Sequence, residues 1–151
     1  GEIWFRGYNV MKGYFNNEEA TRDTMSADGW LKTGDIGVMD QNGYLRITDR
    51  IKDMYISGGF NVYPAEIENG LASIDGVVQS AVIGMDDERM GEVGHAFIVK
   101  KAGSLLTEAE VIAWCKANLA NYKVPRKVTF LDAMPLNASG KILKTELRKY
   151  Q

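Results

Sequence analysis

Cysteine, histidine and proline are scarce in this sequence. Its 151 residues contain one Cys, one His and three Pro, which excludes a disulfide scaffold and a zinc site built from Cys and His ligands. We therefore predict no metal site in the chain itself. Apolar runs are also short, and none approaches the roughly 20 residues that a transmembrane helix needs, so we expect no transmembrane segment. A single unpaired thiol is typical of a reducing compartment, and we expect a cytoplasmic location.

A strong net charge is absent as well. The chain has 18 Lys+Arg against 20 Asp+Glu and is 45% hydrophobic, which is typical of a folded protein of one domain or two small ones. Residues 121–151, however, contain 7 Lys+Arg and only 2 Asp+Glu. Such a basic segment is either a solvated surface or a site for an anionic ligand. Because the sequence has no nucleic-acid-binding motif, we expect a small phosphorylated ligand rather than nucleic acid.

The first fifty residues have the pattern of a small β-rich region. The sequence opens inside a strand pattern and without an initiator Met, so we expect the chain to be a piece of a longer protein. Asn16 to Glu19 can begin a short helix, and a turn at 40–43 separates two strands. Strands are predicted at 1–5, 30–38 and 44–48, and the helix is predicted to end near residue 25.

Strands and helices alternate from residue 51 onward. Pro64 is typical of the first turn of a helix, and Thr107 to Glu110 has the spacing of a capping box. His95 and Cys115 fall in apolar patterns, and we interpret both as buried structural residues. Further strands are predicted at 52–57, 77–84, 95–100 and 128–131, and a last helix at 145–150. The predicted fold class is α+β: the end of a β-rich segment followed by a compact α+β domain.

Two stretches in the first half contain residues suited to chemistry. In Thr33-Gly34-Asp35, the carboxylate follows a glycine turn and could accept both hydroxyls of a ribose, although turn aspartates usually bond to local backbone. Charges alternate over residues 49–53, and Gly58-Gly59 follows, a pair that allows a sharp turn or a close approach to a ligand. A charged edge strand with a glycine turn is the alternative interpretation of this second stretch.

A third stretch, from Pro135 to Lys141, ends in Gly-Lys but is not a P-loop. Pro135 stands where that motif needs Gly, and Ile142 stands where Ser or Thr would bind magnesium. What is left is a lysine on a loop rich in turn residues. Such a loop can present a cation to a site that another domain supplies, or it can be a solvated surface loop.

Taken in order, these stretches resemble the C-terminal part of the adenylate-forming superfamily, the AMP-dependent synthetases and ligases. Residues 28–35, 49–68 and 135–141 each resemble a family motif, and together the resemblance covers essentially the whole chain. The sequence of residues 55–68 most resembles that of acyl-CoA synthetases of the fatty-acid type. The resemblance implies a ligase that converts a carboxylic acid and ATP into an acyl adenylate and pyrophosphate, and then uses CoA to form acyl-CoA and AMP.

The same resemblance implies roles in the first step for four residues. Asp35 would hold the ribose hydroxyls of AMP or ATP, and Arg50 would support the ribose and phosphate side. Lys141 would be the catalytic cation at the carboxylate and the α-phosphate. Lys52 would be the hinge about which a mobile domain turns between the two half-reactions.

Five further residues are implied in the second step, at a CoA site. Gly58 and Gly59 would line the path of the pantetheine arm, where a side chain would obstruct the thiol. By analogy with the family, Tyr122, Lys123 and Arg126 would contact the CoA nucleotide, which would give the basic segment a ligand.

The resemblance also implies a division of the chain. Residues 1–50 would be the remainder of an N-terminal large domain, 51–52 the hinge, and 53–151 the mobile C-terminal domain. The ATP-phosphate loop, the acyl pocket and most of the magnesium site would lie in the missing N-terminal domain, so we expect this chain to be inactive alone.

Two alternatives to a CoA ligase are open at this point. One is an adenylation domain that loads a carrier protein instead of CoA. The other is a non-catalytic module that binds a nucleotide or a protein partner, although a lysine-tipped loop is not needed for binding alone.

Overall fold

The computed structural model describes residues 1–150. The chain divides into two compact units, Gly1–Lys52 and Asp53–Gln151. Each unit has its own sheet, of three strands in the first and five in the second.

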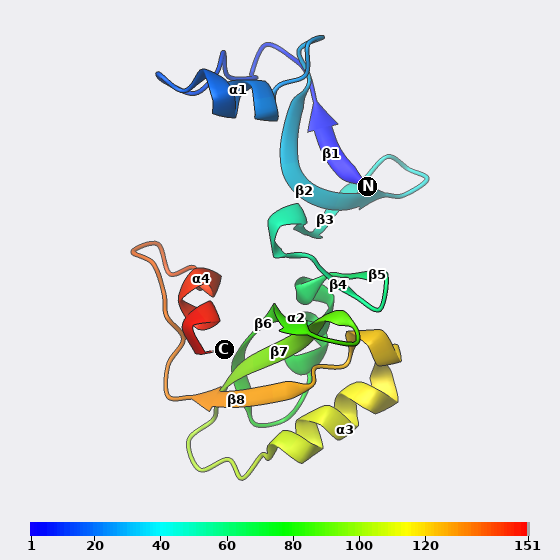
Figure 1. The fold of residues 1–151 in the computed structure, drawn as a ribbon, viewed down its shortest axis with the longest axis vertical. Coiled ribbons are helices and arrows are strands. Elements are labelled where there is room, and N and C mark those ends of the chain that lie inside the picture. Colours follow the sequence, from blue (N-terminus) through cyan, green and yellow to red (C-terminus); the bar gives the residue numbers. More distant parts are fainter. Residues whose placement is uncertain (151) are drawn as a thin grey trace. The chain divides into compact units, whose positions relative to one another are not determined.

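The first unit is an antiparallel sheet in the order β1-β2-β3, with one short helix (Figure 1). Asn17 begins the helix, because its side-chain oxygen accepts a hydrogen bond from the backbone N–H of Ala20 at 3.0 Å. The expected strands and helix of this region are confirmed. Their bounds are β1 Glu2–Phe5, α1 Glu18–Thr24, β2 Leu31–Met39 and β3 Leu45–Arg50.

The predicted turn at 40–43 joins β2 to β3. Asp40 accepts hydrogen bonds through Oδ1 from the backbone N–H groups of Asn42 (2.8 Å) and Tyr44 (2.9 Å). Gly43 has φ of +85°, a conformation that glycine adopts without steric cost. The turn sets the register of the strand ends, and a shift of one residue between Ile36 and Gly37 then places Asp35 of β2 opposite Arg50 of β3.

The second unit is a mixed sheet in the order β5-β4-β7-β6, with β8 parallel to β7. The parallel pair needs a crossover, which α3 provides. The predicted α+β class is confirmed. The elements are β4 Tyr55–Ser57, β5 Phe60–Val62, α2 Pro64–Leu71, β6 Val77–Asp87, β7 Gly91–Lys100, α3 Glu108–Asn118, β8 Lys127–Leu131 and α4 Lys144–Leu147.

The structure differs from the predictions for this unit at three places. The strand expected at 52–57 begins with a 3₁₀ turn, Ile51–Asp53, and only Tyr55–Ser57 is a strand. A strand at Phe60–Val62 was not expected, since three residues are too few to show an alternating pattern. The helix predicted at 145–150 is α4 followed by a 3₁₀ turn, Arg148–Tyr150.

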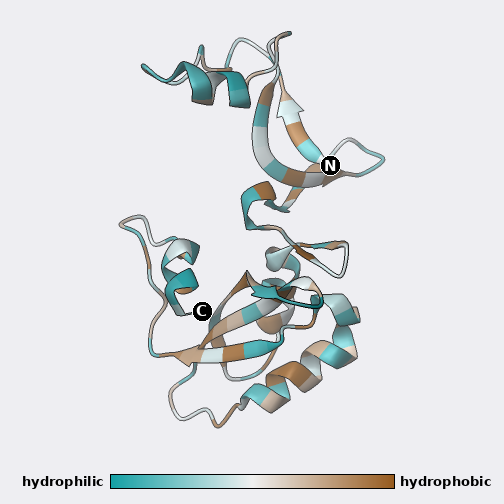
Figure 2. Cartoon of the chain, in the orientation of Figure 1, coloured by the Kyte–Doolittle hydropathy of each residue, from teal (hydrophilic) through white to brown (hydrophobic). Residues whose placement is uncertain are grey.

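The sheet of the second unit is covered on both faces. Strand residues alternate between faces, so Val82 and Ala96 pack with α2 and α3, whereas Ala81, Ile83 and Phe97 pack with Leu147 of α4. Figure 2 shows apolar and polar residues sharing α3 and β8, as expected for elements with one buried face. His95 and Cys115 are fully buried, as predicted. Within residues 1–150, no helix has the length and apolar character needed to cross a membrane.

Candidate functional site

Asp35 and Arg50 form an ion pair across strands β2 and β3. The Nε atom of Arg50 lies 3.1 Å from Oδ1 of Asp35, and their side chains are 69% and 22% exposed. A carboxylate and a guanidinium that both reach solvent can bind a polar anionic ligand together, the first through hydroxyl groups and the second through phosphate oxygens.

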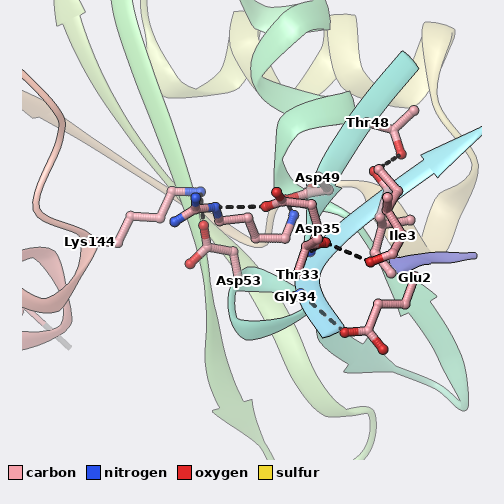
Figure 3. A network of polar contacts seen from close by, with 11 residues as sticks. Glu2, Ile3, Thr33, Gly34, Asp35, Thr48, Asp49, Asp53 and Lys144 are labelled. Carbon is pink, nitrogen blue, oxygen red and sulfur yellow. Dashed lines mark hydrogen bonds and ion pairs between the residues drawn. The ribbon is translucent and has the colours of Figure 1, made fainter. Parts of the chain in front are cut away.

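The backbone around Asp35 is fixed by side chains of its neighbours (Figure 3). Thr33 donates its hydroxyl to the carbonyl of Ile3 at 2.8 Å and accepts from the N–H of Asp35 at 3.0 Å. Glu2 accepts from the N–H of Gly34 at 3.1 Å, and Gly34 has φ of +73°. The carboxylate is therefore held at the end of an ordered turn.

In the second unit, Gly58 and Gly59 form the two-residue turn between β4 and β5. Both have positive φ, +58° and +84°, as the tight hairpin turn requires. The N–H of Gly58 donates to the carbonyl of Met90 at 2.8 Å. A Cβ at Gly58 would lie 2.6 Å from Cε of Met90, whereas a Cβ at Gly59 would meet no atom within 4 Å. The turn thus has one packed glycine and one that faces open space.

The predicted CoA residues Tyr122, Lys123 and Arg126 lie on or just after a 3₁₀ turn, Asn121–Lys123. The ring of Tyr122 stacks on Phe60, with centroids 4.6 Å apart, so the structure brings Tyr122 next to the glycine turn. Arg126 is exposed.

Lys123 has a different setting from Arg126. Its ammonium contacts both carboxylate oxygens of Glu66, at 2.6 and 2.8 Å, and its side chain is only 19% exposed. Much of the charge of Lys123 is therefore satisfied within the protein, which leaves Arg126 as the more available cation of the two.

Lys141 lies on a loop that is ordered by one asparagine. Oδ1 of Asn137 accepts from the N–H groups of Ser139 (3.0 Å) and Lys141 (2.8 Å) and from the hydroxyl of Ser139 (2.8 Å). The N–H of Asn137 donates to the carbonyl of Lys141 at 2.8 Å. The Lys141 side chain is exposed, and within residues 1–150 no carboxylate forms an ion pair with it. Its charge is available to a ligand.

The remaining predicted residue, Lys52, is exposed and is the last residue of the first unit. The sequence interpretation missed several residues that the structure places around the predicted ones. Phe60 and Glu66 contact the presumed CoA residues, and Asp53 and Glu68 form ion pairs with Lys144. The signal for these residues was weak, because each pair joins segments far apart in the chain.

Metal ligands are not gathered within residues 1–150. Over the part of the chain that the structure describes, no three His, Cys, Asp or Glu side chains are grouped so as to hold a metal ion. These residues do not provide a ready set of ligands for magnesium.

The second unit of the chain matches a known family. A family model described as AMP-binding enzyme C-terminal domain matches residues 66–141. The chain belongs to this family. The expected resemblance to the C-terminal part of AMP-dependent synthetases and ligases is thereby confirmed.

Curated relatives of this family member are CoA ligases. The chain is 62% identical over 149 residues to the 3-[(3aS,4S,7aS)-7a-methyl-1,5-dioxo-octahydro-1H-inden-4-yl]propanoyl:CoA ligase of Rhodococcus jostii (strain RHA1). It is 51% identical over 149 residues to a 2-succinylbenzoate-CoA ligase of Bacillus cereus (strain ATCC 10987 / NRS 248). These matches cover 99% of this chain but only 29% and 30% of the two relatives.

Solved structures share the fold. The ATP-bound MatB of Rhodopseudomonas palustris matches with a TM-score of 0.94 at 43% identity, over 99% of this chain and 30% of that one. The o-succinylbenzoate CoA synthetase of Bacillus subtilis, in complex with its acyl-adenylate intermediate, matches with a TM-score of 0.89 at 44% identity, over 98% and 30%.

Proposed function

We propose that this chain is the C-terminal part of an AMP-forming acid–thiol ligase. In the first step a carboxylate oxygen attacks the α-phosphorus of ATP and pyrophosphate leaves. In the second step the sulfur of CoA attacks the acyl carbon and AMP leaves. The observation that carries the proposal is the unpaired, exposed Lys141 on its Asn137-ordered loop, in a chain whose curated relatives are CoA ligases.

In this proposal the first step uses three charged side chains. Asp35 holds the ribose hydroxyls and Arg50 the ribose and phosphate side, while Lys141 stabilises the negative charge that develops between carboxylate and α-phosphate. The magnesium that accompanies ATP is bound mainly by the N-terminal domain, which would belong to the part of the relatives' length that this chain does not span.

The second step uses the surface around the glycine turn. Gly59 leaves room for the pantetheine arm, because nothing lies within 4 Å of the Cβ position. Tyr122 and Arg126 contact the CoA nucleotide, and Lys123 contributes less because Glu66 pairs with it.

We assign residues 1–50 to the end of the large domain, 51–52 to the hinge and 53–151 to the mobile domain, in a protein of the cytoplasm. The boundary between the two compact units, after Lys52, supports this division. The acid is proposed to be a propanoate carried on a bicyclic ketone, because the two relatives named for that acid are 62% and 59% identical, against 51% for the succinylbenzoate ligase.

The test is acyl-CoA formation from ATP, magnesium and CoA with a panel of acids. The panel contains the bicyclic propanoate, 2-succinylbenzoate, ferulate and a fatty acid, and it is given both to the full-length protein and to the 151-residue chain. We expect the full-length protein to form acyl-CoA from the bicyclic acid and the 151-residue chain alone to form none. Turnover by the chain alone, or a full-length protein that forms adenylate yet transfers it only to a carrier protein, would contradict the proposal.

A further inference from the structure

A second lysine near the Lys141 loop is held between two carboxylates. The ammonium of Lys144 lies 2.8 Å from Oε1 of Glu68 and 3.8 Å from Oδ2 of Asp53, and Figure 3 shows it beside the Asp53 carboxylate. The three side chains are only 21%, 22% and 34% exposed. Charges that are largely removed from water are stable only when paired, so this cluster fixes its members strongly.

Glu68 is the rigid member of the cluster. It lies on α2, and its Oε1 also accepts the backbone N–H of Val82 in β6 at 2.8 Å. The carboxylate is therefore tied to both the helix and the sheet, and it offers Lys144 a fixed point in the domain.

Lys144 connects that point to the Lys141 loop. It is the first residue of α4 and follows Lys141 by three positions. The N–H of Leu143 donates to the carbonyl of Pro135 at 2.8 Å, which closes the base of the loop. Leu147, in the same short helix, is fully buried against the sheet. The loop is thus held by two backbone hydrogen bonds across it, from Leu143 to Pro135 and from Asn137 to Lys141, and at its C-terminal side by a buried leucine and an ion cluster.

Asp53 brings the hinge side of the domain into the cluster. It is the first residue of the second unit and follows the proposed hinge, Lys52, directly. The Lys144 ammonium therefore joins the point where the chain enters the mobile domain to the loop that presents Lys141.

We propose that Lys144 is a positioning residue: through Glu68 and Asp53 it fixes the Lys141 loop relative to the hinge, so that domain rotation delivers Lys141 accurately. This inference rests on the proposed function. A misplacement of a reacting group by about 1 Å can cost on the order of 100-fold in rate. In this proposal Lys144 acts through Lys141, because its own ammonium is paired with the two carboxylates.

The test measures the two half-reactions separately in the full-length protein. In Lys144→Met we expect the rate of pyrophosphate exchange to fall by about 10- to 100-fold with KM for ATP little changed. Thioester formation from supplied acyl adenylate should be unaffected, because it does not use the Lys141 loop. Lys144→Arg, which keeps the positive charge, should have a rate of pyrophosphate exchange close to that of the wild type. The matched control is Lys149→Met, which removes an exposed lysine whose partner is Glu146 in the same segment.

A double variant separates positioning from stability. In Lys144→Met the Glu68 carboxylate has lost its ion-pair partner, which should lower the melting temperature. Adding Glu68→Gln removes that unpaired charge, so the melting temperature should rise again while pyrophosphate exchange stays low. Recovery of exchange together with stability would overturn the proposal, as would an equal loss in both half-reactions of Lys144→Met.

Hydrogen exchange gives a readout that does not need activity. We expect the backbone amides of residues 137–143 to exchange faster in Lys144→Met than in the wild type or Lys149→Met. Unchanged exchange there would overturn the positioning role. If these amides exchange faster in Lys144→Met but the wild-type protein forms no adenylate, the proposed function is refuted while the contact between Lys144 and the loop is established.

Discussion

Arg50 and Asp35 are direct cross-strand partners, and the guanidinium Nε lies 3.1 Å from the carboxylate. Exposed ion pairs of this kind contribute about 0–1 kcal/mol to folding. Because the Arg50 side chain is 69% exposed, the contribution of this pair lies at the lower end of that range. The pair therefore matters little for stability, and in the proposed function it offers both a cation and an acceptor to the nucleotide.

Replacing Asp35 by Asn should weaken ATP binding without unfolding the protein. A charged hydrogen bond is worth about 1.5–3 kcal/mol, so we expect Kd for ATP to rise at least about 10-fold. The melting temperature should change little. Titration calorimetry of the full-length protein measures the first quantity, and Asp75→Asn is the control, because Asp75 also forms an ion pair with a cation, Lys101, but lies outside the proposed site. Equal effects of both variants on ATP would contradict the assignment.

Removing the charge of Lys141 should separate the two half-reactions. In Lys141→Met we expect pyrophosphate exchange to fall by about 100-fold or more, since one stabilising group in a transition state is commonly worth that much. Acyl transfer to CoA from supplied acyl adenylate should be retained. Lys116→Met, which removes an exposed lysine of α3, should alter neither step. A comparable loss in both steps would show that Lys141 is not specific to adenylation.

A side chain at Gly59 should obstruct the second step alone. Gly59→Ala places a Cβ in open space at φ of +84°, so the variant costs about 1–2 kcal/mol of backbone strain but no clash within the protein. We expect a reduced rate of thioester formation and normal pyrophosphate exchange. Gly103→Ala imposes the same strain at φ of +76°, also in open space, and should leave both rates unchanged. If it slows thioester formation equally, strain rather than obstruction is the cause.

Arg126 and Lys123 should differ in their effect on CoA. Arg126→Gln removes an exposed cation, and we expect KM for CoA to rise about 5- to 10-fold, as loss of a charged hydrogen bond implies. Lys123→Gln should raise KM less and lower the melting temperature more, because Glu66 then loses its partner. Steady-state kinetics and thermal melts of the two variants measure these effects. A larger rise in KM for Lys123→Gln than for Arg126→Gln would contradict the prediction.

His95 should make folding stability depend on pH. Burial, assisted by the nearby cation of Lys127, lowers the pKa of His95 from 6.5 to about 4. The ring thus stays neutral in the folded protein while it protonates in the unfolded chain below its ordinary pKa. Stability should therefore fall as the pH drops from about 6.5 to about 4, by on the order of 1–3 kcal/mol.

The variant that tests this is His95→Gln, which can keep a hydrogen bond to Thr129, now 2.8 Å from Nε2. Its free energy of unfolding should be nearly flat between pH 6.5 and 4.5 in denaturant titrations. Carboxylates whose pKa is lowered, such as Asp87 beside the N–H groups of Met90 and Arg89, lose their contribution only at lower pH. An unchanged slope in the variant would assign the effect to other groups.

Local chemistry made much of the fold predictable. The capping box of Thr107 and Glu110 and the first-turn Pro64 lie within a few residues of what they stabilise, and both helices formed as expected. The family motifs likewise lie in short stretches, which is why the site candidates could be named. The pairing of Lys144 with Glu68 could not, because nothing in either local sequence says that Lys144 of α4 will reach Glu68 of α2.

The Lys141 loop also has a consequence for engineering. Met134 at its start and Leu147 just after it cover Ala81, Ile83 and Phe97, so the segment that carries the cation is at the same time the cover of a hydrophobic core. The packing of this segment on the core therefore orders it when the protein folds, before any ligand binds. A chimera in which only the loop is exchanged would separate Lys141 from the side chains that cover the core. An exchange of residues 132–150 as one piece would transfer Lys141 together with those core residues.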